Sequence, residues 1–307
     1  MTPKNVLTRL PKGGPEQQAV EAGEIDAIID YPGGNVILLP AARRALREAA
    51  KRTSAANREA PIANANAVLA ALSHADYQRL LAVLDPISLK FGEVLHEPGV
   101  PIRYVYFPVN CAISLLMAAG GERALEVGLV GREGMVGISL ALGVEVSSVR
   151  ALVQASGMAM RMKAAHFREA LRQCPSLQRE LYRYADAELA LARQIVACNC
   201  FHAVEARLAR WLLMTSDRVL SEEFFLTQDF LAQMLGVRRG TVNEAAGSLQ
   251  QRNLISYSRG KIRILDPKGL EAASCPCYTR IEVCTRASGA GTYFRPGASG
   301  MEREAEC

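Results

Sequence analysis

Several motifs that define common enzyme, membrane and secreted proteins are missing from this 307-residue chain. No apolar run approaches the roughly 18 residues that a membrane-spanning helix needs. The N-terminus lacks the basic-then-apolar layout of a signal peptide. There is no Walker loop, Gly-x-Ser-x-Gly elbow, His-Glu-x-x-His motif or dinucleotide fingerprint. We therefore expect a cytoplasmic protein that makes no membrane contact and is not an enzyme.

The eight cysteines lack the spacing of a disulfide framework, so we expect reduced thiols. Cys198 and Cys200 would point to different faces of a helix and cannot jointly hold one metal ion. Cys275, Cys277 and Cys284 could form a three-thiolate site. The sequence favours structural or incidental thiols and assigns no metal ligand, but a redox or metal switch stays open as an alternative.

Basic residues concentrate in one part of the chain. The whole sequence holds 36 Lys and Arg against 31 Asp and Glu, a formal net charge of +5. Glu244 is the only acid between Gly236 and Arg263. The same segment holds six basic residues: Arg238, Arg239, Arg252, Arg259, Lys261 and Arg263. Such a concentration of positive charge is typical of a surface that binds phosphates.

This basic segment has the pattern of a helix-turn-helix. Thr227 can cap a first helix, because its hydroxyl accepts a free amide of the first turn. Gly236 can end that helix in the left-handed conformation, and a second helix begins near Val237. In this motif the first residues of the second helix reach base edges in the major groove. The predicted base-reading residues are Arg238, Arg239, Thr241, Asn243 and Glu244.

A β-hairpin follows the two helices. Residues 254–257 and 261–264 alternate with period two around Arg259 and Gly260, which predicts a wing. Arg259 and Lys261 at its tip are predicted phosphate contacts. The alternative is a small helical bundle with a solvated basic rim.

Outside the basic segment, the amino-acid composition changes along the chain. Residues 1–62 are rich in Ala, Gly, Pro, Arg and Glu, and we expect a disordered extension, in which 38–51 could form a short basic helix. Residues 63–175 open with short helices, the second capped by Ser73. From Leu89 to Met162 they continue as short β-type runs broken by glycine, as in a β-barrel or sandwich. A short helix over residues 164–173 follows. Residues 274–307 are predicted to be a flexible, cysteine-containing tail.

Residues 176–201 predict one long helix. Apolar residues recur along it at alternating intervals of four and three residues, which is typical of a coiled-coil seam. The predicted seam residues are Leu181, Tyr184, Glu188, Leu191, Ile195 and Cys198. The same stripe could instead pack on the β-domain of its own chain. We prefer a dimer, because a helix-turn-helix usually reads two half-sites through two-fold symmetry. Residues 202–273 form the DNA-binding region, beginning with a helix over 202–214.

The order of a glycine-punctuated β-domain, a long helix and a winged helix-turn-helix resembles the Crp/Fnr family of bacterial transcription regulators. The resemblance covers residues 65–272. Its most specific segments are FGEVLHEPG, VYFP, VGREGMVG and LTQDFLAQMLGVRRGTVNEAAGSLQQRNLI. It implies an α+β fold with an N-terminal β-roll (jelly-roll) of the cyclic-nucleotide-binding type. It also implies a homodimer that binds a near-palindromic double-stranded DNA operator and contacts RNA polymerase.

The resemblance extends to individual positions of the reading helices. The family's phosphate-contacting helix start matches Thr227 and Gln228. Its reading tetrad matches residues 238–241, where the arginine and the threonine are kept and the glutamate is replaced by Gly240. A further reading arginine is replaced by Glu244. Because an acid accepts from the amino group of cytosine, the target should differ from the best-known family consensus.

The β-domain departs from the members that bind cyclic AMP. Ile138 replaces the glutamate that bonds a ribose hydroxyl, and the hydroxyl pair that touches adenine becomes Ala192 and Arg193. Each loss leaves a polar group of the ligand unpaired, at a cost of roughly 1–3 kcal/mol. We therefore do not expect control by cyclic AMP. The predicted effector pocket consists of Gly137, Ser148, Arg150 and Arg193.

Other cofactors of the family are not expected either. The first 110 residues contain no cysteine, so the iron–sulfur cluster of the oxygen-sensing branch is not expected. The four histidines are isolated in sequence, and such histidines are more often surface or core residues than haem ligands. The cofactor is left unknown. The leading interpretation is a dimeric, sequence-specific transcription regulator. The alternative is a redox, metal or small-ligand sensor whose helix-turn-helix serves protein contacts.

Overall fold

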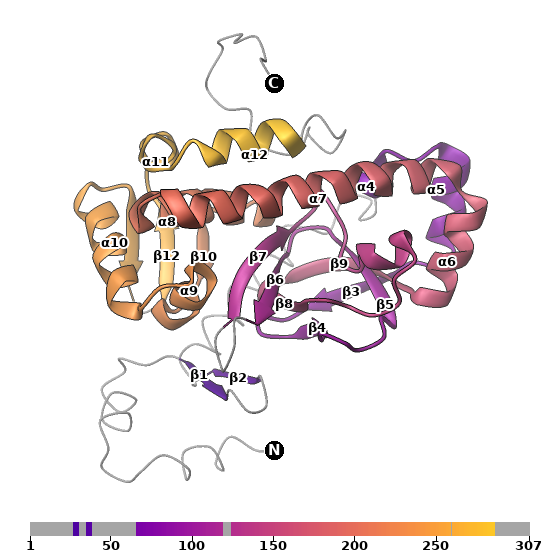
Figure 1. The fold of residues 1–307 in the computed structure, drawn as a ribbon, viewed down its shortest axis with the longest axis horizontal. Helices are drawn as coiled ribbons and strands as arrows, with labels where there is room; N and C mark the ends of the chain where they lie inside the picture. Colours follow the sequence, from indigo (N-terminus) through magenta and orange to yellow (C-terminus); the bar gives the residue numbers. More distant parts are fainter. Residues whose placement is uncertain (1–26, 31–34, 39–65, 119–123, 259, 286–307) are drawn as a thin grey trace.

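Seven antiparallel strands between residues 85 and 163 form two sheets with a shared core in this computed structural model (Figure 1). One sheet has the order β3-β9-β5 and the other the order β4-β8-β6-β7. Leu89 and Tyr106 from the first sheet pack with Ile113 and Val153 from the second. This arrangement confirms the predicted β-roll.

The structure describes residues 27–30, 35–38, 66–118, 124–258 and 260–285. The strands of the β-roll are β3 (Asp85–Leu89), β4 (Val94–His96), β5 (Tyr104–Pro108), β6 (Ala112–Ala118), β7 (Ala124–Val130), β8 (Arg150–Ala155) and β9 (Gly157–Lys163). A short 3-10 helix, η2 (Ile138–Leu142), connects β7 to β8.

The first strand begins earlier than the sequence pattern indicated. The predicted β-region opened at Leu89, whereas β3 starts at Asp85 and includes Pro86. Proline has no N–H to donate, which is tolerated at the edge of a sheet. Because β3 is an edge strand that pairs only with β9, Pro86 does not break the ladder.

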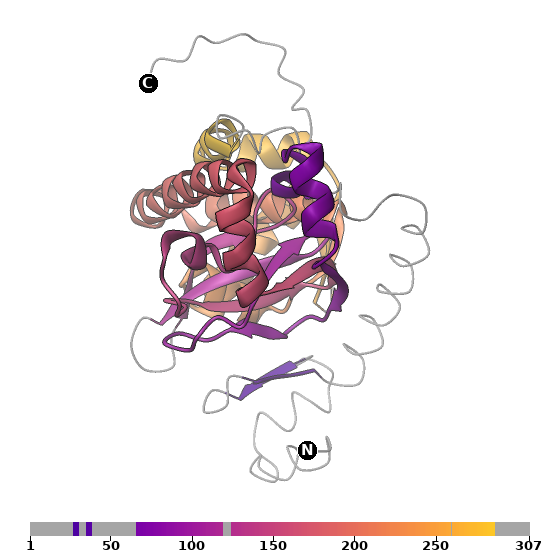
Figure 2. The ribbon, with the colours of Figure 1, turned by 90° about the vertical axis from the view of Figure 1, so that its right-hand side faces the viewer.

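Helices cover one side of the β-roll (Figure 2). They are α4 (Ala67–Ala70), α5 (His74–Leu81) and α6 (Ala164–Gln173), and they precede or follow the strands in sequence. Asn66 and Ser73 cap α4 and α5, because each side chain accepts a backbone amide of the first turn. The predicted Ser73 cap and the predicted helix over residues 164–173 are confirmed.

The long helix α7 (Pro175–Phe201) turns the predicted seam toward its own chain. Leu181 and Tyr184 pack in the core next to the β-roll, and Cys198 packs in the core next to the following helix. All the predicted seam residues are buried or half-buried here: Leu181, Tyr184, Glu188, Leu191, Ile195 and Cys198. This packing against the chain's own core is the alternative that the sequence left open for the stripe. It buries Leu181, Tyr184 and Cys198, so these three side chains are not available as a dimer seam.

The next helix, α8 (Val204–Val219), is longer than predicted. The sequence suggested an end at Met214, because polar residues follow it. Arg218 remains helical and buried, because its guanidinium lies 2.7 Å from the carboxylate of Glu133 in the β-roll. An ion pair between two domains therefore extends the helix through a polar stretch.

The C-terminal region contains the expected winged helix-turn-helix. Its helices are α9 (Gln228–Leu235) and α10 (Arg239–Gln251), and its wing strands are β11 (Ile255–Ser258) and β12 (Lys261–Ile264). A third strand, β10 (Glu223–Phe225), pairs with β12 and was not predicted.

Residues 274–285 continue as ordered structure, in contrast to the predicted tail. After α11 (Pro267–Ala273) comes α12 (Cys277–Thr285), which lies alongside α7 and contacts α8 (Figure 1). Cys275, Cys277 and Ile281 are buried in this packing. The prediction of a flexible tail is therefore wrong for residues 274–285.

The N-terminal extension contains a described hairpin of β1 (Ala27–Asp30) and β2 (Asn35–Leu38), which the sequence did not predict. The rest of the extension lies outside the described residues. Of the predicted helix over 38–51, only Leu38 is described, and it belongs to β2.

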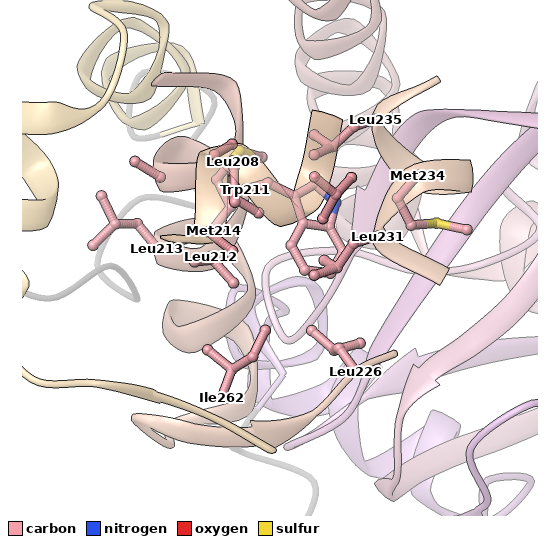
Figure 3. Packing of buried hydrophobic residues seen from close by; sticks show 14 of the residues in the cluster. Leu208, Trp211, Leu212, Leu213, Met214, Leu226, Leu231, Met234, Leu235 and Ile262 are labelled. Carbon is pink, nitrogen blue, oxygen red and sulfur yellow. The ribbon is translucent and has the colours of Figure 1, made fainter. Parts of the chain in front are cut away.

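One hydrophobic cluster joins the β-roll to the DNA-binding region. Leu129 of β7 packs in the same buried cluster as Trp211 and Leu212 of α8 and Leu231 of α9. Figure 3 shows the indole of Trp211 surrounded by apolar side chains of α8, α9 and the wing. No described helix combines the length and apolar character needed to cross a membrane.

Candidate nucleic-acid interface

The turn between α9 and α10 is formed by the residues that the sequence indicated. The Thr227 hydroxyl accepts the backbone N–H of Phe230 at 3.1 Å and begins α9. Gly236 ends α9 with φ of 65°, a left-handed angle that favours glycine. Arg238 is the N-cap of α10, so the reading helix starts one or two residues later than the predicted Val237.

The packing of α10 separates a core face from a solvent face. Val242, Ala245, Ala246 and Leu249 are buried against the rest of the domain. Four residues at the start of α10 and on its outer face are exposed: Arg238, Arg239, Asn243 and Glu244. Thr241 is half-buried between these two faces. The predicted base-reading residues are therefore available to a groove, with Thr241 the least exposed of them.

Hydrogen bonds join three of the predicted DNA contacts into one surface. Arg239 Nε donates to Gln228 Oε1 at 3.2 Å, and Gln228 Nε2 donates to Asn243 Oδ1 at 3.0 Å. This chain places the start of α9 next to the first turn of α10. A carboxylate oxygen of Asp229 also lies 3.8 Å from Arg239, a contact that the sequence reasoning missed. DNA phosphates would compete with this acid for the guanidinium.

The wing carries a basic edge that is partly neutralised. The Lys261 ammonium lies 2.8 Å from a carboxylate oxygen of Glu223. This pairing follows from the unpredicted strand β10, which brings Glu223 beside the wing. Arg259, the other predicted phosphate contact of the wing, lies outside the described residues.

The predicted effector residues come from β8, from the connection between β7 and β8, and from α7. Arg150 Nε donates to Glu97 Oε2 at 2.9 Å, and Ser148 is exposed nearby in sequence. Gly137 begins η2 with φ of 100°, and Arg193 is exposed on α7. The guanidinium of Arg150, a cation of the predicted effector pocket, is thus already engaged by a carboxylate.

A buried polar network connects the β-roll with α8, and no sequence pattern indicated it. The Trp211 indole N–H donates to Glu126 Oε1 at 2.8 Å, and the Ser114 hydroxyl donates to Glu126 Oε2 at 2.7 Å. Gln154 Nε2 donates to Thr215 Oγ1 at 2.9 Å. Burial raises the pKa of Glu126 to about 7, although its two hydrogen bonds act in the opposite direction.

Four potential metal ligands lie together at the junction of α7 and α8. Cys198, His202, Cys275 and Cys277 place one ligand atom each within 4.8 Å of one another. Contact with Cys275 lowers the pKa of Cys198 to about 4, and the same contact raises the pKa of Cys275. His202 lies beside Cys198 of the same helix end and beside Cys275 and Cys277, which come from a segment more than 70 residues further along the chain.

Comparisons with known proteins agree with this geometry. The sequence model of the Crp-like helix-turn-helix domain matches residues 206–273. The transcriptional regulator SdrP of Thermus thermophilus is 28% identical over 197 residues, which cover 62% of this chain and 94% of SdrP. A CRP-like cAMP-activated global transcriptional regulator of Mycobacterium tuberculosis is 24% identical and covers 61% of this chain and 87% of its own length.

Solved structures share the fold. A putative regulator of the Crp/Fnr family from Eubacterium rectale superposes with a TM-score of 0.54 at 17% identity, covering 68% of this chain and 98% of its own. FixK2 from Bradyrhizobium japonicum superposes with a TM-score of 0.53 at 17% identity, covering 63% of this chain and 98% of its own. The match to the Crp-like helix-turn-helix domain identifies residues 206–273 as a DNA-binding domain of the type found in transcription regulators. The chain is similar to transcription regulators of the Crp/Fnr type, and its residues 206–273 match the Crp-like helix-turn-helix domain.

Proposed function

We propose that this protein binds a near-palindromic operator as a homodimer, with α10 of each protomer in the major groove. The exposed pair Arg238 and Arg239 at the start of α10 is the observation that carries the proposal. An arginine fork can bond two acceptors of guanine. Asn243 and Glu244 follow on the same exposed face, and Thr241 lies at its border. Thr227, Gln228, Arg259 and Lys261 contact the phosphates and set the register.

The dimer forms along a stripe of α7 that is one residue out of phase with the seam predicted from the sequence. Tyr182, Leu189 and Val196 are 50%, 48% and 63% exposed. Ala185 and Ala192 lie between them at the three-four spacing of a coiled coil, and both are half-buried. The neighbouring face of α7 contacts the chain's own core, and this stripe carries exposed apolar side chains that a second copy of the helix could cover.

Control by cyclic AMP is not part of the proposal, although one relative is named as cAMP-activated. Ile138 packs against a hydrophobic cluster of the β-roll at the place of the ribose-binding glutamate. Arg150 already pairs with Glu97. A ligand phosphate would have to displace that carboxylate. An effector pocket near Gly137, Ser148, Arg150 and Arg193 remains a proposal for a different small molecule.

The proposed division of labour follows the chain. Residues 63–175 sense, residues 176–201 dimerise, and residues 202–273 bind DNA, with α12 now added to the DNA-binding unit. Contact with RNA polymerase is proposed from the family resemblance.

Selection of bound duplexes from a random pool, at stated salt, tests the proposal. We expect one enriched half-site, repeated with two-fold symmetry about one or a few helical turns apart. Arg239→Ala should weaken binding to that operator by roughly 1–3 kcal/mol per half-site and relax the preference at one base position.

Arg172→Ala is the matched control, because Arg172 is 70% side-chain exposed on α6, far from the reading helix in sequence. It should leave operator binding unchanged. Equal binding to all duplexes by the wild-type protein, or equal effects of the two substitutions, would contradict the proposal.

A further inference from the structure

Three thiols and one imidazole meet where α7 turns into α8. The Cys198 and Cys275 sulfurs are 3.4 Å apart, and the Cys277 sulfur lies 3.4 Å from His202 Nδ1. All four ligand atoms lie within 4.8 Å of one another. Cys198, Cys275 and Cys277 are buried, and His202 is half-buried, so the cluster is closed on most sides.

Local structure aims these side chains at one point. Cys198 and His202 are four residues apart, so they project from the same face at the end of α7. Cys275 and Cys277 flank Pro276 at the start of α12, and the Cys275 N–H donates to the Ala206 carbonyl of α8 at 3.4 Å. Two helices and one short turn therefore supply the four groups.

The separations suit a single ion better than a cluster of several. Zn²⁺ binds sulfur at about 2.3 Å and nitrogen at about 2.0–2.1 Å in a tetrahedron. Tetrahedral angles then place two sulfurs about 3.8 Å apart and a sulfur and a nitrogen about 3.6 Å apart. The two measured 3.4 Å separations are within a few tenths of an ångström of these values.

The surroundings fit a site with net negative charge. Arg210 is 4% exposed, and its Nε has no hydrogen-bond partner among the described residues. A divalent ion held by three thiolates and a neutral imidazole carries one negative charge, which would offset this buried cation. Gln194 Nε2 also donates to the Cys277 sulfur at 3.0 Å, as outer-shell partners of metal ligands do.

We propose that Cys198, His202, Cys275 and Cys277 bind one thiophilic divalent ion of the Zn²⁺ type. Three soft thiolates and one imidazole favour such an ion over Mg²⁺ or Ca²⁺. All four positions of a tetrahedron are filled by protein, so the site is structural and leaves no position for a substrate.

The bound ion fixes α12 across the turn between the dimerisation helix and the DNA-binding domain. Tyr278 anchors the same helix to α8, because its hydroxyl donates to Asp217 Oδ2 at 2.8 Å. Metal binding to the folded form alone stabilises that form by mass action. Loss of the ion should therefore loosen α12 first, because Cys277 of α12 and Cys275 just before it are two of the four ligands.

Titration of the reduced, metal-free full-length protein with Co²⁺ tests the site directly. We expect one equivalent per chain, with thiolate-to-cobalt charge-transfer absorption and the visible bands of tetrahedral Co²⁺. Zn²⁺ should displace the cobalt and abolish these bands. Hydrogen exchange of residues 277–285 should slow when Zn²⁺ is added. This measurement does not depend on operator binding, so it stands apart from the proposed function.

Cys277→Ser should weaken Co²⁺ binding by at least 10-fold and abolish the slowed exchange of α12. Cys200→Ser is the matched control, because Cys200 is exposed on α7 two residues from Cys198 and is not a ligand. It should bind one equivalent, as the wild-type protein does. Circular dichroism of both variants checks that they fold.

Three results would overturn the proposal. The first is a reduced wild-type protein that gives no tetrahedral Co²⁺ spectrum. The second is a Cys198–Cys275 disulfide that forms in the presence of equimolar Zn²⁺. The third is a purified protein that holds iron and inorganic sulfide at this position, which would replace the single ion by a cluster.

Discussion

Glu126 is the residue at which the two domains are most sensitive to pH. It is 5% exposed, and burial raises its pKa from 4.5 to about 7. Because the folded-state pKa lies above the unfolded value, its contribution to stability is fully present below pH 4.5. That contribution is lost as the pH rises through about 7. The loss is on the order of 3 kcal/mol.

Glu126→Gln should therefore flatten the dependence of the unfolding free energy on pH between about 4.5 and 7. The amide keeps an acceptor for the Trp211 indole and does not titrate. Denaturant unfolding at several pH values measures this effect. Burial also raises the pKa of Glu188 to about 7. Glu188→Gln should therefore remove a second, separate part of the pH dependence of the unfolding free energy. Identical profiles for the wild-type protein and Glu126→Gln would contradict the assignment.

Two glycines give opposite expectations for the same substitution. A Cβ at Gly247, within α10, meets nothing within 4 Å, whereas a Cβ at Gly134 would lie 2.1 Å from the Tyr184 ring. Gly247→Ala should stabilise the protein by about 0.5–1 kcal/mol through helix propensity. Gly134→Ala should destabilise it by several times that amount, because Tyr184 is held on α7. Thermal unfolding of both variants tests these two expectations. A Gly134→Ala protein that is more stable than the wild type would contradict them.

At the scale of elements, the proposed dimer depends on the exposed stripe of α7. Val196→Glu places a charge in the centre of the proposed coiled-coil seam and should produce monomers in sedimentation experiments. Val144→Glu is the matched control, since Val144 is 48% exposed and follows η2, well away from α7 in sequence. It should remain dimeric. A Val196→Glu protein that sediments with the wild-type dimer would disprove this seam.

The same helix illustrates how much of the fold the sequence could predict. Its length and amphipathic character followed from local spacing, but its orientation did not. Positions 181, 184 and 188 and positions 182, 185 and 189 both have three-four spacing, so either face could have been the seam. Only packing against the β-roll distinguishes them, because it buries Leu181 and leaves Tyr182 exposed.

Long-range contacts also explain the other differences. Thr227 and Gly236 were predictable, because capping and turn chemistry depend on neighbouring residues. The order of α12 depends on contacts with α7 and α8, which composition alone does not reveal. The site of Cys198, His202, Cys275 and Cys277 was missed for the same reason. Its two halves are separated by more than 70 residues, so spacing within either half gave too few ligands.

At the scale of the whole molecule, the β-roll and the DNA-binding region should unfold together. Leu129 of the β-roll and Leu212 of α8 belong to one buried cluster, and Trp211 lies in it as the only tryptophan of the chain. Tryptophan fluorescence therefore reports the domain contact, and far-ultraviolet circular dichroism reports the helices throughout. We expect the two signals to give coincident denaturant transitions.

Leu129→Ala and Leu212→Ala should each move both transitions together, by roughly 2–5 kcal/mol, because each removes buried volume from the shared cluster. The exposed Leu142 provides a control, since it is 57% exposed and Leu142→Ala should leave both transitions in place. If Leu129→Ala shifted an early transition and left the fluorescence change of Trp211 where it was, the domains would be independent. A shared transition would instead mean that a change that destabilises the β-roll also destabilises α8, which packs against α10 and its arginines.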